Sequence, residues 1–122
     1  MHTILICDDD TLILELMEFR LQAKGYTVIK AEDGEQALKQ TAEARPSLVV
    51  LDAMMPKLDG FQVLSRLKAN EDLRHIPVIM LTARKGEQEI VSALERGAED
   101  YLVKPFIPDE LMTRLSKILS KK

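Results

Sequence analysis

Cysteine, aromatic residues and long apolar runs are scarce in this 122-residue sequence, which has one cysteine, no tryptophan and 4% aromatic residues. One cysteine excludes an internal disulfide and is typical of the reducing cytoplasm. Because Cys7 ends an apolar stretch, we expect a small buried side chain rather than a reactive thiol. No apolar run approaches the roughly 18 residues of a membrane-spanning helix, and the N-terminus lacks a signal-peptide pattern. We therefore expect a cytoplasmic protein.

The sequence also lacks an excess of basic residues. It has 17 Lys and Arg against 20 Asp and Glu, a net charge of −3, which argues against direct nucleic-acid binding by this chain. Hydrophobic residues at 46% and charged residues at 30% are ordinary for a globular protein. A chain of this length can bury a substantial core. We expect residues 1–122 to form a single domain.

Short apolar stretches alternate with amphipathic ones along the whole chain. The apolar stretches predict buried strands, at residues 4–7, 26–29, 47–52, 76–81 and 101–103. The amphipathic stretches predict helices, at about 11–24, 34–44, 59–69, 86–96 and 108–120. This alternation predicts an α/β domain with a parallel sheet, right-handed crossovers and helices on both faces.

The first predicted helix carries apolar residues in two neighbouring rows. Leu12, Leu16 and Phe19 form one row at helical spacing. The second row contains Ile13, Met17 and Leu21. Together the rows form a broad stripe, as expected of a helix that packs on a core.

Polar residues follow four of the predicted strands. Asp8 and Asp9 follow the first strand and Asp52 ends the third. Thr82 follows the fourth strand and Lys104 the fifth. Since the carboxyl ends of parallel strands meet in one crevice, we expect these side chains to lie together. Asp52 would be the centre of the group.

These side chains predict a particular chemistry. Several carboxylates in one crevice repel one another unless a cation neutralises them, and carboxylates, carbonyls and water are the ligands of Mg²⁺. A lysine and a threonine add donors for a polyanionic group. An acidic nucleophile, a hard metal ion and two donors indicate phosphoryl transfer to a carboxylate. The pair that follows the second strand, Ala31-Glu32, has no role that we can assign.

Some of the acidic residues have a purely structural interpretation. Asp10 stands where it can cap the first helix. Asp59, followed by Gly60, is expected to cap the third helix. The two histidines, His2 and His75, have no metal-ligand partners at useful spacing and are expected on the surface.

The whole chain resembles the receiver domain of two-component response regulators. The residues that carry the resemblance are Ile6-Cys7-Asp8-Asp9-Asp10, Leu51-Asp52 with Met55-Pro56 and Asp59-Gly60, Leu81-Thr82-Ala83, and Gly97-Ala98 through Tyr101 to Lys104-Pro105-Phe106. Each motif is weak alone, but together in this order they are specific. The resemblance implies a flavodoxin-like, CheY-like (βα)5 fold, with the strands in the order 2-1-3-4-5.

The resemblance also assigns roles to individual residues. It implies that Asp52 accepts a phosphoryl group from a histidine of a sensor kinase or phosphotransfer protein. Mg²⁺, or Mn²⁺ in its place, would be held by Asp52, by Asp9 directly, by Asp8 through water and by the backbone carbonyl of Met54.

The remaining roles concern the phosphoryl group and the response to it. Lys104 would contact the phosphoryl oxygens, and its bond to Pro105 would be cis, as a proline permits. Thr82 would be the switch hydroxyl and Tyr101 the aromatic switch residue. Such a protein modifies only itself and is not a turnover enzyme.

The partners and the output are less specified. Receivers with winged-helix DNA-binding outputs dimerise through the helix near 86–96, the strand 101–103 and the helix 108–120. The residues that match their charged pairs are Glu99, Asp100, Glu110 and Arg114. Ile90 departs from the pattern, because an arginine commonly stands at this position and makes one of the charged pairs. A dimer of this chain would then either depend more on apolar contact or differ from the standard one. The segment from Leu67 to Pro77 equally resembles receivers attached to diguanylate cyclases, and a free-standing regulator also remains open.

Two competing functions belong to other classes. A metal-dependent phosphatase or hydrolase of similar α/β fold could use Asp52 as its nucleophile, but such enzymes commonly carry a second acid where this chain has Met54. The chain also has no room for the lid insertion of those enzymes. A degenerate receiver that only binds partners would lack an acceptor or metal-binding acid, and none is missing here.

Overall fold

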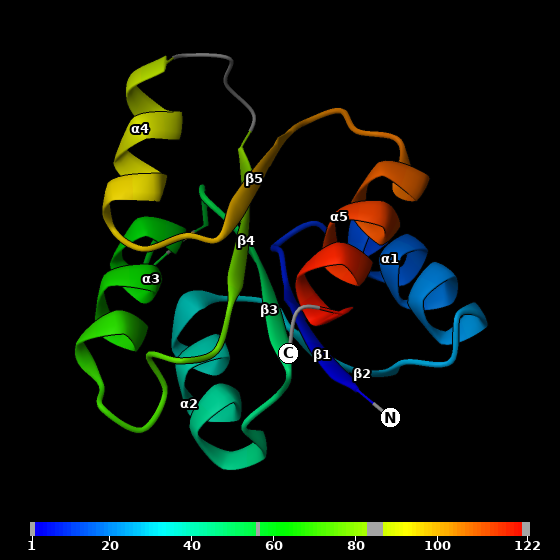
Figure 1. Ribbon diagram of the computed structural model, residues 1–122, viewed down its shortest axis with the longest axis horizontal. Coiled ribbons are helices and arrows are strands. Elements are labelled where there is room, and N and C mark those ends of the chain that lie inside the picture. Colours follow the sequence, from blue (N-terminus) through cyan, green and yellow to red (C-terminus); the bar gives the residue numbers. More distant parts are fainter. Residues whose placement is uncertain (1, 56, 83–86, 121–122) are drawn as a thin grey trace.

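The structure is a computed structural model, which describes residues 2–55, 57–82 and 87–120. Its centre is a sheet of five parallel strands in the order β2-β1-β3-β4-β5 (Figure 1). The predicted α/β class, parallel sheet and strand order are therefore confirmed. The strands are β1 (Thr3–Cys7), β2 (Thr27–Ala31), β3 (Leu48–Asp52), β4 (Val78–Thr82) and β5 (Asp100–Val103).

In the described part of the chain, five helices cover both faces of the sheet. The chain steps from β1 to β2 in one direction and then from β2 to β3, β4 and β5 in the other, and right-handed crossovers of opposite direction lie on opposite faces. Figure 1 shows α1 and α5 on one side of the sheet and α2, α3 and α4 on the other. Each face has its own apolar core, one packed by α1 and α5 and one by α2, α3 and α4. The helices are α1 (Thr11–Ala23), α2 (Gly34–Ala44), α3 (Gly60–Ala69), α4 (Glu87–Glu95) and α5 (Pro108–Ser120).

The middle strands are enclosed on both faces. Every residue of β3 and of β4 is buried, which explains why these stretches read as continuous apolar runs rather than alternating ones. The register aligns Cys7 with Leu51 and Asp52 with Leu81. The carboxyl ends of β1, β3 and β4 therefore lie side by side.

Aspartates cap the first three helices. The side chain of Asp10 accepts hydrogen bonds from the backbone N–H groups of Leu12 and Ile13 at the start of α1. Asp59 and Gln62 form a reciprocal capping box on α3. The structural interpretation of Asp10 and Asp59 is therefore confirmed, and Asp33 caps α2 in the same way.

The broad apolar stripe expected on α1 is wrong for one of its two rows. Leu12, Leu16 and Phe19 are 73%, 50% and 71% exposed. The helix instead buries Leu14, Met17 and Leu21 against the sheet. Apolar residues occupy most of the circumference of α1, so periodicity alone could not select the inward side. The exposed row is an apolar surface next to the carboxyl edge of the sheet.

Several smaller expectations have a clear outcome. Cys7 is buried and His2 and His75 are exposed, as predicted. The Lys104-Pro105 bond is cis. Tyr26 was predicted in β2, but this strand begins at Thr27, and β4 begins after Pro77, which has no N–H for a ladder.

Three predicted features fall outside the described residues. They are two motif residues, Pro56 and Ala83, and the predicted start of the fourth helix at Gly86. Among the described residues, no helix is long and apolar enough to cross a membrane.

Candidate functional site

Three aspartates meet at the carboxyl edge of the sheet. Asp8 follows β1 and Asp52 ends β3, and both are buried, whereas Asp9 is exposed. One carboxylate oxygen from each of the three lies within 4.8 Å of the others. The strand register produces this grouping, because β1 and β3 are paired neighbours. The side chains expected to form the centre of the site are thus together.

Lys104 connects two of these carboxylates. Its Nζ lies 2.8 Å from Oδ2 of Asp8 and 3.3 Å from Oδ1 of Asp52. The lysine reaches the aspartates from the far side of Asp52, from the loop that follows β5. The other oxygen of Asp8 accepts a hydrogen bond from the backbone N–H of Asp10, at 2.9 Å. Both oxygens of the buried Asp8 are therefore satisfied.

Thr82 and Tyr101 lie on the strands between Asp52 and Lys104. Thr82 ends β4 and is 4% exposed, and its carbonyl accepts a 2.7 Å hydrogen bond from the N–H of Lys104. Tyr101 is half-buried on β5 and packs against the core that α2, α3 and α4 cover. The ladder aligns Thr82 with Val103, two residues beyond Tyr101. The two proposed switch residues are therefore on adjacent strands.

Met54, like Asp9, is an exposed member of the predicted site. Its side chain is 62% exposed, and its backbone N–H lies 3.5 Å from Oδ1 of Asp52. The main chain of the loop after β3 thus folds back toward the carboxylate. The side chain itself projects away from the core.

The electrostatics of the site follow from burial and repulsion. Burial and the neighbouring Asp8 raise the pKa of Asp52 from its ordinary value of 3.8 to about 6, against the opposing effect of Lys104 and the Met54 N–H. Burial alone would lower the pKa of Lys104, but its hydrogen bond to Asp8 and the charges of both aspartates raise it. Burial, followed by Asp8, raises the pKa of Cys7, so the thiol stays protonated and unreactive.

Two backbone contacts that support the site were not predicted. The carbonyl of Ala31, which ends β2, accepts a hydrogen bond from the N–H of Asp8 at 3.2 Å. This contact gives a supporting role to the end of the second strand. The N–H of Gly60 donates to the carbonyl of Ala53 at 2.9 Å, which closes the loop between β3 and α3. Backbone contacts of this kind leave no residue-type signature, and the Asp59-Gly60 pair by itself indicates only a turn.

An apolar groove adjoins the site on the side of α1. Its volume is about 400 Å³, and Lys104 is shared between the groove and the aspartates. The groove lies between α1 and the loop that leads into α5. The residues that line it are Ile13, Leu16, Met17, Lys104, Pro105, Phe106 and Pro108.

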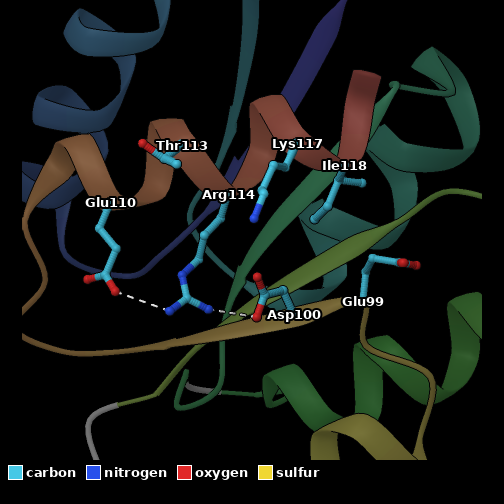
Figure 2. A pocket seen from close by; sticks show the side chains of 7 residues that line it. All are labelled: Glu99, Asp100, Glu110, Thr113, Arg114, Lys117 and Ile118. Atoms are coloured by element: carbon cyan, nitrogen blue, oxygen red, sulfur yellow. Dashed lines mark hydrogen bonds and ion pairs between the residues drawn. The ribbon is translucent and has the colours of Figure 1, made fainter. Parts of the chain in front are cut away.

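A second, polar hollow of about 600 Å³ lies between β5 and α5, away from the aspartates (Figure 2). At its centre Arg114 lies 2.8 Å from Oδ1 of Asp100 and 3.2 Å from Oε2 of Glu110. The hollow therefore has charges of both signs. The remaining residues that line it are Glu99, Thr113, Lys117 and Ile118.

The donor set of the aspartate cluster fits a hard divalent cation. The cluster offers three carboxylates that could hold one ion together, and carboxylate oxygens are ligands of Mg²⁺. Oxygen-only donors of high charge density suit Mg²⁺ rather than a soft metal. With one lysine beside three acids, the site retains negative charge for a cation to neutralise.

Replacing Asp52 with Asn should stabilise the metal-free protein near neutral pH. The folded state holds the proton of Asp52 up to about pH 6, whereas an unfolded aspartate loses it near 3.8, so stability falls as pH rises through this window. We expect Asp52→Asn to raise the free energy of unfolding by about 1–2 kcal/mol in EDTA. Urea denaturation measures this gain, which should vanish as the pH approaches 3.8. Asp72→Asn, at an exposed position, is the control and should change little; equal gains in both variants would contradict the interpretation.

Comparison with known proteins identifies the fold and the family. The model of the response regulator receiver domain matches residues 4–116. The alkaline phosphatase synthesis transcriptional regulatory protein PhoP of Bacillus subtilis is 44% identical over 118 residues, which are 97% of this chain and 48% of that protein. The response regulator MprA of Mycobacterium ulcerans is 43% identical over the same length, covering 97% of this chain and 50% of that protein. The chain spans about half the length of these curated relatives.

Solved structures give the same result. The receiver domain of a Francisella response regulator superposes with a TM-score of 0.93 at 31% identity, covering 99% of this chain and 98% of the other. The receiver domain of a sensor histidine kinase from Pseudomonas aeruginosa, solved with a magnesium ion coordinated in its active-site cleft, has a TM-score of 0.89 at 31% identity and 98% coverage of both chains. The phosphatase alternative is not favoured. The chain belongs to the response regulator receiver domains, which receive phosphoryl groups in two-component signal transduction.

Proposed function

We propose that Asp52 is the carboxylate that accepts the phosphoryl group, and that residues 1–122 act as a single receiver domain. The observation that supports this most strongly is the position of Lys104, whose ammonium lies 2.8 Å from Asp8 and 3.3 Å from Asp52. A cation between a metal-binding acid and a nucleophilic acid can contact the oxygens of a phosphoryl group attached to Asp52.

The chemistry is a transfer between two nucleophiles. The P–N bond to a donor histidine breaks while a P–O bond to Asp52 forms, and the electron pair of the broken bond stays on the imidazole. Asp52 must be ionised to attack, and its raised pKa leaves it ionised above about pH 6. The chain acts only on its own carboxylate, in its phosphorylation and in its later hydrolysis.

Mg²⁺, or Mn²⁺ in its place, would be held by Asp8, Asp9, Asp52 and the carbonyl of Met54. When bound, the ion supplies charge neutralisation between the carboxylates and the incoming phosphoryl oxygens. The chain itself holds Asp8 and Lys104 in place. The N–H of Asp10 donates to one oxygen of Asp8, and Lys104 donates to the other.

The response would pass through Thr82 and Tyr101. An acyl phosphate on Asp52 adds negative charge and acceptor oxygens, which attract Lys104 and the hydroxyl of Thr82. Tyr101 is half-buried on the neighbouring strand, so an inward shift of Thr82 would let its ring turn inward. This alters the surface made by α4, β5 and α5, which we call the output face, as a two-state element biased by local charge.

Substitution of the acceptor tests the proposal. We expect Asp52→Asn to lose labelling by radioactive acetyl phosphate in Mg²⁺, because an amide cannot form the acyl phosphate. Lys104→Ala should keep the acceptor but react at least about tenfold more slowly, since one charged contact to the phosphoryl group is lost. Asp59→Asn, which preserves the α3 cap, is the control. Labelling of Asp52→Asn at the wild-type rate would exclude Asp52 as the acceptor.

The donor is proposed to be a histidine of a sensor kinase or phosphotransfer protein that docks on α1. The exposed row Leu12, Leu16 and Phe19 continues into the apolar groove, and Lys104 belongs to both groove and site. A helix seated in the groove would hold its histidine within reach of Asp52. A row of exposed apolar residues beside an apolar groove is the kind of surface on which a partner helix docks.

The double variant Leu12→Ser, Leu16→Ser separates docking from chemistry. With a histidine-phosphorylated kinase that labels the wild type, we expect transfer to fall at least about tenfold, because interface energy is concentrated in a few apolar residues. Labelling by acetyl phosphate should be unchanged, since that donor needs no docking surface. Val91→Ser, with a similar exposure of 49% on α4, is the control. Equal loss with both donors would place the defect in the site rather than in docking.

The proposed output is a homodimer through the output face, together with an output domain or downstream protein. Arg114 is already bound by Asp100 and Glu110 within one protomer, while Val91 and Leu94 of α4 are 49% and 44% exposed. A two-fold contact presents the same patch to itself, so the apolar α4 residues would form its centre. The names of the curated relatives favour an output in transcriptional regulation. Because this chain has a net charge of −3, a separate output domain or partner would contact the DNA.

We propose that the protein acts in the cytoplasm.

The dimer can be tested with beryllofluoride, which mimics the acyl phosphate. With Mg²⁺ and beryllofluoride, we expect the mass measured by size-exclusion chromatography with light scattering to double. Leu94→Asp should remain monomeric, because a charge in the apolar centre is not paired there. Leu12→Asp, on the exposed surface of α1, should still dimerise. An unchanged wild-type mass would argue against phosphorylation-driven dimers.

A further inference from the structure

Gly60, the first residue of α3, lies directly against the backbone of the proposed acceptor. A Cβ atom added at this position would meet the carbonyl oxygen of Asp52 at 2.2 Å and the Cα of Ala53 at 2.8 Å. Ordinary van der Waals contact begins at 3.4 Å, so the chain would have to move by about an ångström. The obstructing atoms are backbone, which cannot rotate away as the end of a side chain can.

The Asp52–Ala53 segment is held on its other side by the sheet. The N–H of Ala53 donates to the carbonyl of Leu81 on β4 at 2.8 Å, and the carbonyl of Ala53 accepts from the N–H of Gly60 at 2.9 Å. The segment therefore sits between β4 and the N-terminus of α3. Any side chain at position 60 would therefore displace either α3 or the backbone of Asp52.

We propose that Gly60 is a positioning residue for the metal site: its missing side chain sets the place of Asp52 relative to Asp8 and Asp9. The inference rests on the proposed role of these aspartates as Mg²⁺ ligands. Starting the helix does not require a special residue at position 60, because the capping box of Asp59 and Gln62 already stabilises the start of α3. The proposal therefore gives Gly60 a separate function.

The physical reason is that Mg²⁺ tolerates little variation in the positions of its ligands. Mg²⁺ requires near-octahedral oxygen ligands at about 2.0–2.1 Å. One oxygen from each of the three carboxylates lies within 4.8 Å of the others, and these oxygens must approach one another further to reach a single Mg²⁺. A displacement of Asp52 by about an ångström would hinder that approach. The same loop carries Met54, whose N–H lies near Asp52, so its carbonyl would move together with the carboxylate.

The test is the Mg²⁺ dissociation constant of Gly60→Ala, measured by isothermal titration calorimetry. Circular dichroism would first establish a temperature at which every variant is folded. We expect Gly60→Ala to bind Mg²⁺ at least about tenfold more weakly than the wild type. Labelling by acetyl phosphate should recover only partly at saturating Mg²⁺, because Asp52 itself is displaced from Lys104.

Two controls separate positioning from general loosening. Gln62→Gly, at an exposed position, weakens the start of α3 by removing the capping box and adds no side chain against the backbone. Gly34→Ala introduces an equal clash, 2.3 Å from the carbonyl of Leu58, at the far end of the same loop. Both should lower the unfolding midpoint yet bind Mg²⁺ within about twofold of the wild type. Equal weakening in all three variants, or normal binding by Gly60→Ala, would overturn the proposal.

The inference and the proposed function fail in different ways. If the wild type is not labelled at Asp52, the proposed function falls; if it is labelled and Gly60→Ala binds Mg²⁺ normally, only the role of Gly60 falls. Should Gly60→Ala not fold in buffer, all variants would be compared in trimethylamine N-oxide, which favours the folded state. The same tenfold difference is expected there.

Discussion

The interaction on which the site depends is the attraction of Lys104 for two buried aspartates. Asp8 is fully buried and Asp52 nearly so. Burial and the negative charge of Asp8, whose carboxylate lies within 4.8 Å, both oppose the ionisation of Asp52. Lys104 reduces that repulsion but cannot remove it, since it is one cation beside three acids. The fold therefore retains excess negative charge at one edge of the sheet. A bound cation would relieve this repulsion, as the proposed function requires.

Every other element contributes to holding that charge in place. The pairing of β1 with β3 brings Asp8 next to Asp52, and the carbonyl of Ala31 on β2 fixes the backbone of Asp8. The bond from Lys104 N–H to the Thr82 carbonyl ties the lysine loop to β4. The helices fill both faces so that the middle strands are excluded from water. Stability and function thus compete at the strand ends, as is common in functional sites.

In the proposed function, two surfaces next to this centre would connect it to its partners. The apolar groove touches the site through Lys104, whereas the output face is reached through Thr82 and the adjacent strand that carries Tyr101. In the proposed function, the groove would receive the phosphoryl donor and the output face would pass on the signal. The two surfaces meet at Pro108, which lines the groove and begins α5.

The sequence by itself determined the α/β class, the parallel sheet, the strand boundaries to within a few residues and the candidate residues at the strand ends. It could do so because apolar periodicity and helix caps are local, as Asp10 and Asp59 illustrate. Only the tertiary structure decided which side of α1 faces solvent, since apolar residues surround most of that helix and packing selects Leu14 over Leu12. It also decided the contacts of Ala31 and Gly60, which act through backbone atoms that every residue type shares. Their place depends on which strands and helices are neighbours, a property of the whole chain.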